Sequence, residues 1–140
     1  MRILAVVCTL AVIVMFSQSC GSSKNLNMLS LLQGKSFNVE SIAGKLLNAE
    51  NFRNGLPNFN FGTDGKLTGN AGCNNFTGNF KMEGKKLNLN PGAMTRMACP
   101  GNDESEFLNA LKQVTGLKQD GNKLKLLNGA NELMSLVPKI

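Results

Sequence analysis

The chain has 140 residues, about the size of one domain, and carries 15 Lys and Arg against 9 Asp and Glu, for a formal charge of +6. It contains no His, Trp or Tyr. Without an imidazole, the sequence excludes Ser-His-Asp and Cys-His nucleophilic enzymes, and also zinc sites built with His ligands.

The N-terminus has the pattern of an export signal. Met1-Arg2 supplies a positive start, and residues 3–16 form a nearly unbroken apolar run. This run is shorter than the roughly 20 residues that span a bilayer, so residues 1–19 favour a signal peptide over a membrane anchor. Small residues at Ser17 and Ser19 suit an ordinary signal peptidase, whereas Cys20 followed by Gly-Ser-Ser resembles a bacterial lipoprotein signal. We expect the second route, with Cys20 lipidated, although Ser17 stands where a lipobox usually has Leu.

The number of cysteines is consistent with lipidation. Cys8 leaves with the signal peptide, and acylation occupies Cys20, so Cys73 and Cys99 remain. An even pair in an exported protein usually forms a disulfide, and two independent buried thiols are the alternative. Ordinary cleavage before Cys20 would leave an odd reactive thiol.

The basic residues are scattered rather than clustered. Without residues 1–19 the chain keeps 14 Lys and Arg against 9 acids, or +5. A nucleic-acid surface would gather its cations, so we expect no nucleic-acid partner. A solvated surface is the simplest interpretation, and mild attraction to anionic lipid or acidic envelope polymers is the alternative.

The chain after the signal divides into a tether and one domain. Residues 20–33 are a lipidated Cys and tether, whose apolar part is expected to dock as a short helical turn. Residues 34–140 are the domain. Short alternating stretches between turn residues are typical of antiparallel strands. We expect about eight, at residues 36–42, 58–62, 66–71, 76–82, 86–90, 93–99, 123–127 and 132–137.

One helix is expected at about 103–115. Asp103 is placed to cap it, acidic residues follow in its first turn, and Gly116 ends it. The apolar residues Phe107, Leu108, Leu111 and Val114 fall on one stripe. The sequence therefore predicts an α+β fold dominated by β structure: a compact antiparallel sheet or half-open barrel whose helix covers one face or end.

Several motifs in their order resemble the META domain family, which includes HslJ-type envelope proteins and lipoproteins. The resemblance covers roughly residues 32–137 and rests on GKLTGNAGCNNFTGNF, MTRMACP, the acidic ESEFLNAL helix and LKLLNGANELMSLV. This sequence has Phe37 where the family is expected to have Trp, and Phe76 where Tyr is expected.

The resemblance implies a compact β-rich envelope fold, with associations to stress response and drug tolerance. It implies no established reaction, no catalytic residues and no cofactor, and it favours pairing of Cys73 with Cys99. We therefore expect no enzyme activity and no metal.

Three residues are candidates for interaction. Asn74 and Asn75 follow Gly72-Cys73 and either form a ligand loop or serve a tight strand connection, which we favour. Arg96 either clamps a carboxylate or phosphate, or pairs with Glu104 or Asp103 to fix strand to helix, which we also favour.

Two functions remain open. The first is a non-enzymatic, lipid-anchored protein of the bacterial cell envelope, facing the periplasm, that contacts an unidentified envelope protein or the envelope itself and is monomeric. The second is a small-molecule or lipid-binding module. Its apolar cavity would be lined by Phe59, Phe61, Phe76 and Phe80, which otherwise fill the core of so small a domain.

Overall fold

The computed structural model describes residues 27–100 and 104–140. The expected signal peptide, the lipidation at Cys20, the first half of the tether and the Asp103 cap lie outside the described residues. In the described part, the short 3-10 helix η2 (Met28–Leu31) precedes the first strand. Leu32, which follows it, is fully buried, so the packed core includes residues on the N-terminal side of Gly34.

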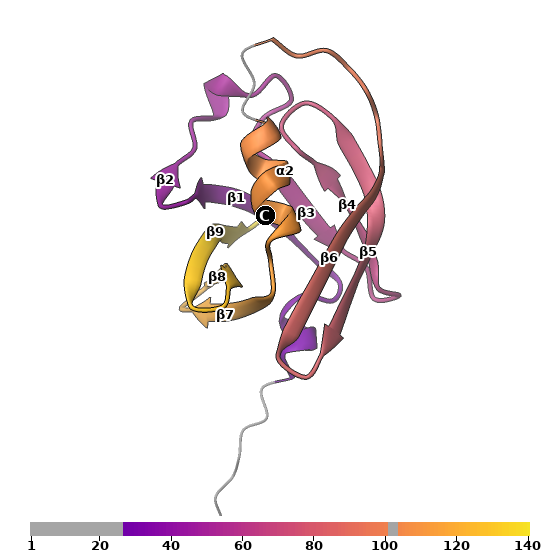
Figure 1. Cartoon of the computed structure of the whole chain (residues 1–140), viewed down its shortest axis with the longest axis vertical. Coiled ribbons are helices and arrows are strands. Elements are labelled where there is room, and N and C mark those ends of the chain that lie inside the picture. Colours follow the sequence, from indigo (N-terminus) through magenta and orange to yellow (C-terminus); the bar gives the residue numbers. More distant parts are fainter. Residues whose placement is uncertain (1–26, 101–103) are drawn as a thin grey trace, which may run out of the picture.

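Nine strands, a second 3-10 helix and one α-helix follow (Figure 1). The strands are β1 (Lys35–Ile42), β2 (Lys45–Leu46), β3 (Asn58–Phe61), β4 (Lys66–Asn70), β5 (Asn75–Glu83), β6 (Lys86–Met94), β7 (Gly116–Asp120), β8 (Lys123–Asn128) and β9 (Asn131–Pro138). The helices are η3 (Ala49–Asn51) and α2 (Glu104–Lys112).

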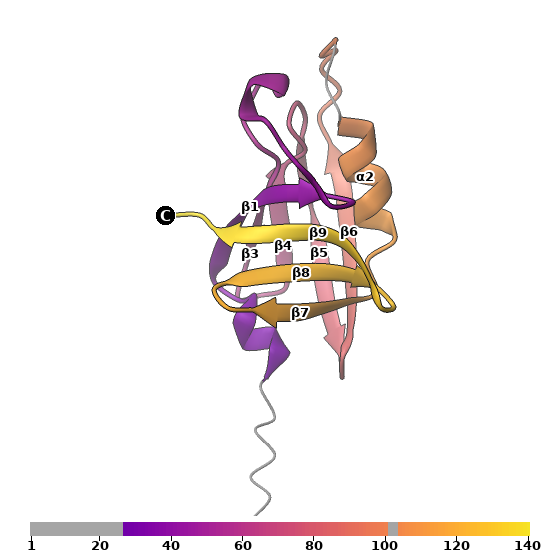
Figure 2. The ribbon, with the colours of Figure 1, turned by 90° about the vertical axis from the view of Figure 1, so that its left-hand side faces the viewer.

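The strands form one antiparallel sheet that curls into a half-open barrel. Its order is β6-β5-β4-β3-β1-β9-β8-β7, with β2 paired to β1. Figure 2 looks onto β1, β9, β8 and β7, with β3 to β6 behind them and α2 beside β6. The two edges approach each other where the Leu87 N–H of β6 donates to the Thr115 carbonyl, 3.0 Å away, just before β7. The predicted fold class is confirmed: residues 27–100 and 104–140 are mostly β structure with one α-helix.

The strand expected at residues 93–99 is wrong as a separate element. β6 continues through Pro91 and Gly92 to Met94, and residues 95–100 form no regular structure. A bulge absorbs the break: the register with β5 shifts between Phe76 and Thr77, and Gly92 takes a positive φ of 61°. Pro91 is tolerated because β6 is an edge strand.

The barrel interior is filled by phenylalanine. The rings of Phe59 and Phe61 lie 5.7 Å apart, and Phe107 of α2 lies 5.4 Å from Phe59. Phe37 and Phe76, which stand where the family is expected to have Trp and Tyr, also belong to the core. Phe37 packs edge-on against Phe61, and Phe76 packs edge-on against Phe59. The residues proposed to line a cavity, Phe59, Phe61, Phe76 and Phe80, are at most 5% exposed. Because their rings pack on one another, they form core and do not line an apolar binding site.

Gly69 shows how closely this core is packed. It lies in β4 between Phe59 of β3 and Phe76 of β5. A Cβ at this position would run into the Asn58 carbonyl and come within 2.6 Å of the Phe76 ring. Glycine is poorly suited to a strand interior, but here it makes room for the neighbouring aromatic ring.

Candidate functional site

The site is built around a disulfide that joins the β4–β5 connection to the segment after β6. Cys73 and Cys99 are bonded, as expected, with their Cα atoms 6.2 Å apart. Cys73 is fully buried, and its sulfur also lies 3.7 Å from the Met97 carbonyl oxygen. The disulfide thus holds the irregular segment 95–100 against the turn that begins β5.

Asn74 reinforces this link with its side chain. Its Oδ1 accepts from the Met97 N–H at 2.7 Å and from the Thr95 hydroxyl at 2.8 Å. Its Nδ2 donates to the Met97 carbonyl at 3.2 Å and to the Glu104 carboxylate at 2.9 Å. The Asn74 N–H also donates to Glu104, at 2.8 Å. Only 5% exposed, Asn74 therefore ties together β5, segment 95–97 and the first turn of α2, which supports a structural role for it.

We expect Asn74→Ala to lower the free energy of unfolding by about 2 kcal/mol, because the backbone of Met97 loses both of its side-chain partners and the Glu104 carboxylate keeps only the backbone N–H of residue 74. The matched control is Asn75→Ala. The Asn75 side chain is exposed and accepts one hydrogen bond, from Asn70, so we expect less than half that loss. Urea denaturation of both variants measures the difference, and equal losses would show that Asn74 does not tie these segments together.

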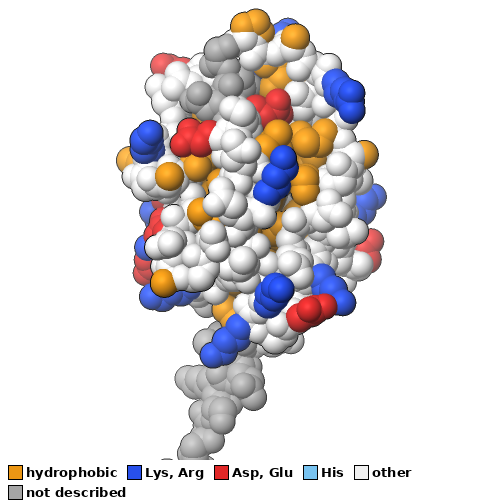
Figure 3. Space-filling model, in the orientation of Figure 1, with side chains coloured by type: hydrophobic (Ala, Val, Ile, Leu, Met, Phe, Trp, Pro, Cys, Tyr) orange, Lys and Arg blue, Asp and Glu red, His pale blue; other side chains and the backbone are white. Residues whose placement is uncertain are grey.

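Arg96 lies over a groove between β6 and α2, which we call the β6–α2 groove. It is a hollow of about 590 Å³ lined by Asn74, Gly92, Ala93, Met94, Thr95, Arg96, Glu104 and Leu108. Figure 3 shows hydrophobic side chains gathered between α2 and β6. Arg96 is exposed and forms no ion pair with Glu104, so that expected pairing is wrong: Glu104 is engaged by Asn74 instead. The alternative partner, Asp103, lies outside the described residues.

Asn75 belongs to a different hollow from its neighbour. Successive strand residues point to opposite faces, so Asn74 turns toward α2 while Asn75 turns to the outside of the barrel. There it lines a hollow of about 640 Å³ over β3, β4 and β5. Of the three candidate interaction residues, Asn74 is therefore buried and structural. Arg96 and Asn75 line two separate hollows on the surface.

Two residues in or next to the groove have positions that the sequence did not predict. Leu108 was expected only as part of the helix stripe, but it is half-buried and lines the groove. Met97, expected in a strand, does not line the groove, but it follows Arg96 in the chain and is 49% exposed. An apolar residue at the edge of the helix stripe was the available signal, but the position of α2 over β6 is a tertiary property.

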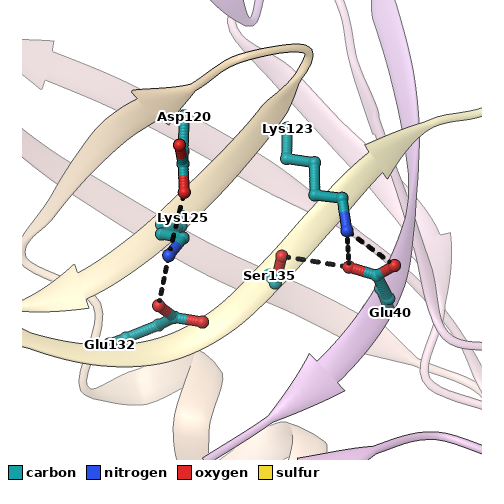
Figure 4. A network of polar contacts seen from close by, with 6 residues as sticks. All are labelled: Glu40, Asp120, Lys123, Lys125, Glu132 and Ser135. Carbon is teal, nitrogen blue, oxygen red and sulfur yellow. Dashed lines mark hydrogen bonds and ion pairs between the residues drawn. The ribbon is translucent and has the colours of Figure 1, made fainter. Parts of the chain in front are cut away.

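The strands on the other half of the barrel carry an ordinary charged surface. Lys125 of β8 pairs with Asp120 at 3.1 Å and with Glu132 at 3.0 Å, while Lys123 pairs with Glu40 of β1 at 2.7 Å (Figure 4). The hydrogen bond from Lys123 holds the pKa of Glu40 below its ordinary value of 4.5. Lys125 likewise lowers the pKa of Asp120, and the network fixes β8 to its neighbours.

The lowered pKa makes the contribution of Glu40 to folding stability depend on pH. A carboxylate whose pKa is depressed by folding stabilises the protein above its ordinary pKa, and that stabilisation is lost as the pH falls through the folded value. We therefore expect Glu40→Gln to have a lower Tm than wild type at neutral pH and the two to converge well below pH 4.5. Thermal denaturation across pH measures this. Glu106→Gln, whose carboxylate forms no ion pair within the described residues, is the control, and a pH-independent gap for Glu40→Gln would contradict the account.

The described residues hold neither a cluster of metal ligands nor a helix that could span a membrane. Residues 27–100 and 104–140 contain no group of three or more His, Cys, Asp or Glu side chains placed to hold a metal ion. No helix in the same residues is long and apolar enough to cross a bilayer.

Comparison with known proteins gives a family but no activity. No curated protein matches the chain significantly. A protein solved by NMR is 27% identical, with a TM-score of 0.62 over 78% of this chain and 92% of its own. An NMR structure of a protein from Burkholderia xenovorans is 22% identical, with a TM-score of 0.62 over 82% and 88%. The crystal structure of a DUF4847 family protein from Bacteroides vulgatus is 20% identical, with a TM-score of 0.56 over 79% and 96%. The sequence model of the META domain matches residues 30–139, and the chain therefore belongs to the META domain family.

Proposed function

We propose that this chain is a non-enzymatic domain of the bacterial cell envelope, tethered through a lipid on Cys20, that acts by holding a protein partner in the β6–α2 groove. The observation that supports it most is the composition of that groove. Met94 and Leu108 supply apolar surface, and Arg96 and Glu104 stand with them. Protein interfaces combine an apolar centre with a polar rim and are enriched in Met and Arg.

The rim of the groove is held firmly in place. Residues 95–97 lack regular structure, yet the disulfide and the Asn74 side chain fix them. A surface that is ordered before binding loses less conformational entropy when a partner arrives. This rigidity favours Arg96 and Met97 as contacts with a partner.

The position of the groove suits a tethered protein. η2, the first described element, lies at the end of the molecule where the β5–β6 hairpin turns, whereas α2 begins toward the opposite end (Figures 1 and 2). A lipid on Cys20 would place the η2 end toward the membrane and leave the start of α2 facing away from it. The same tether would suit the role in stress response or drug tolerance that the family suggests.

Photo-crosslinking in the native bacterium tests the groove. With a photoreactive residue in place of Met97, we expect a discrete protein adduct, and with the same residue in place of the exposed Lys118 on β7 we expect none. Adding Arg96→Glu to the Met97 probe should lower the adduct yield at least about tenfold, since Arg is a frequent hot-spot residue. Tm should stay unchanged. Equal yield from both probes, or no effect of Arg96→Glu, would contradict the proposal.

A further inference from the structure

The outer face of β1, β3, β4 and β5 carries two rows of uncharged polar side chains in register across the strands. One row is Asn38, Asn58, Asn70 and Asn75, each paired with the next across neighbouring strands. The second row, two residues along, is Ser36, Asn60, Thr68 and Thr77. With strands about 4.8 Å apart, each row is about 14 Å long. We call this surface the amide face.

The amide face is hollowed rather than flat. The hollow of about 640 Å³ described above lies over it, and its lining includes Asn58, Asn60, Thr68, Asn70, Asn75 and Thr77. Asn54, from the loop before β3, stands at its rim. A ligand seated there would meet side chains from three adjacent strands at once.

Several of these side chains keep their hydrogen-bonding capacity open. Within the described residues, the side chains of Asn60, Thr68 and Thr77 make no hydrogen bond to protein. Asn70 is different, because its amide is used locally: it donates to Asn75 Oδ1 at 2.8 Å and accepts from the Gly72 N–H at 2.6 Å. One row is thus partly fixed by internal bonds, while the other presents free donors and acceptors to the hollow.

Strand propensity does not explain this composition. Asparagine is depleted in strands, and a solvated sheet surface is better served by Thr, Lys or Glu. The other half of the same barrel follows that rule, with Lys118, Lys123 and Lys125 outward on β7 and β8. Asparagines also occur outside the hollow, as in Asn79 and Asn90 of β5 and β6, but only on the amide face do they form an uncharged row across four strands.

We infer that the amide face binds a neutral polysaccharide. The two rows contain no charged side chain, so a phosphate, a nucleic acid or a lipid headgroup would find no counter-charge there. The one large apolar side chain in the lining of the hollow is Phe76, which is only 1% exposed and offers little surface to a hydrophobic partner. A primary amide and a sugar hydroxyl are each both donor and acceptor, so each can satisfy the other directly or through a bridging water. This binding is independent of the protein partner proposed for the β6–α2 groove.

Affinity electrophoresis of the full chain in native gels tests the inference. The probes are soluble neutral polysaccharides (dextran, mannan and laminarin), with dextran sulfate as the charged comparison. We expect at least one neutral polymer to slow the protein. The double variant Asn60→Ala/Thr77→Ala should bind it about tenfold more weakly, because two hydrogen-bonding groups are lost. Asn88→Ala/Asn109→Ala, which removes two exposed amides elsewhere, should bind like wild type, and all Tm values should agree.

Four results would overturn the inference. They are no retardation by any neutral polymer, retardation by dextran sulfate alone, equal binding by the Asn60→Ala/Thr77→Ala variant, and a wild-type dimer that this variant converts to monomer. The last would make the amide face a self-association surface. The Arg96→Glu variant distinguishes this proposal from the proposed protein partner in the β6–α2 groove. The variant should form little crosslinked protein adduct but should bind the polysaccharide like wild type.

Discussion

Phe59→Ala should lower the free energy of unfolding by about 3–5 kcal/mol, the usual cost of truncating a buried phenylalanine. Phe59 is 0% exposed and lies at the centre of the aromatic core, with ring centroids 5.7 Å from Phe61, 6.0 Å from Phe76 and 5.4 Å from Phe107. The loss combines the transfer free energy of the deleted ring with the cost of the cavity left between β3 and α2. Urea denaturation measures it.

The matched control for Phe59→Ala is Phe59→Leu. It keeps most of the volume and should cost about 1–2 kcal/mol. This comparison also tests whether the core is filled, because a ring that bordered an open cavity would be truncated at little cost. A loss below about 1 kcal/mol for Phe59→Ala would contradict the packed core and restore the cavity interpretation.

Removing the disulfide should be the second largest effect, at about 3 kcal/mol. Cys73 and Cys99 are 26 residues apart. Closing a loop of that length lowers the conformational entropy of the unfolded chain and so raises its free energy by about 3 kcal/mol. We expect the double variant Cys73→Ala/Cys99→Ala to fold but to unfold at lower urea concentration. The double change avoids leaving a lone thiol at the buried Cys73 position.

Reductant provides the internal control for that experiment. Reduction should bring wild type close to the variant and leave the variant unchanged. Without reductant, segment 95–97 should be more protected from hydrogen exchange in wild type than in the variant, because the disulfide and Asn74 both hold it. Unchanged stability on reduction would show that the bond adds nothing to the hold of Asn74.

The strands could be predicted from sequence wherever the alternation was clean. β3 places Phe59 and Phe61 inward and Asn58 and Asn60 outward, and β8 does the same with Leu124 and Leu126. Turn dipeptides such as Asp64-Gly65 and Asn128-Gly129 predicted where the strands are joined by hairpins. Prediction failed at Pro91-Gly92, which normally ends a strand, because a bulge on an edge strand lets β6 continue past it.

The candidate site was only partly predictable. The cysteine pairing could be predicted from the number of cysteines, and the sequence indicated Asn74, Asn75 and Arg96 as three candidate interaction residues. Their separation depends on tertiary structure: Glu104, the expected partner of Arg96, is engaged by Asn74 across 30 residues of sequence. The amide face likewise requires strand order, since its asparagines are spread from residue 38 to residue 75 and align only in the folded sheet.

Membrane fractionation tests the envelope tether most directly. We expect the wild-type chain in the membrane fraction, released by detergent, with a lipid mass on the peptide that begins at Cys20. Cys20→Ala should remove the lipid and move the chain to the soluble fraction, while the control Cys8→Ala should behave like wild type. Equal membrane retention of wild type and Cys20→Ala, or no lipid mass on Cys20, would contradict a lipid-anchored domain that works by contact in the envelope.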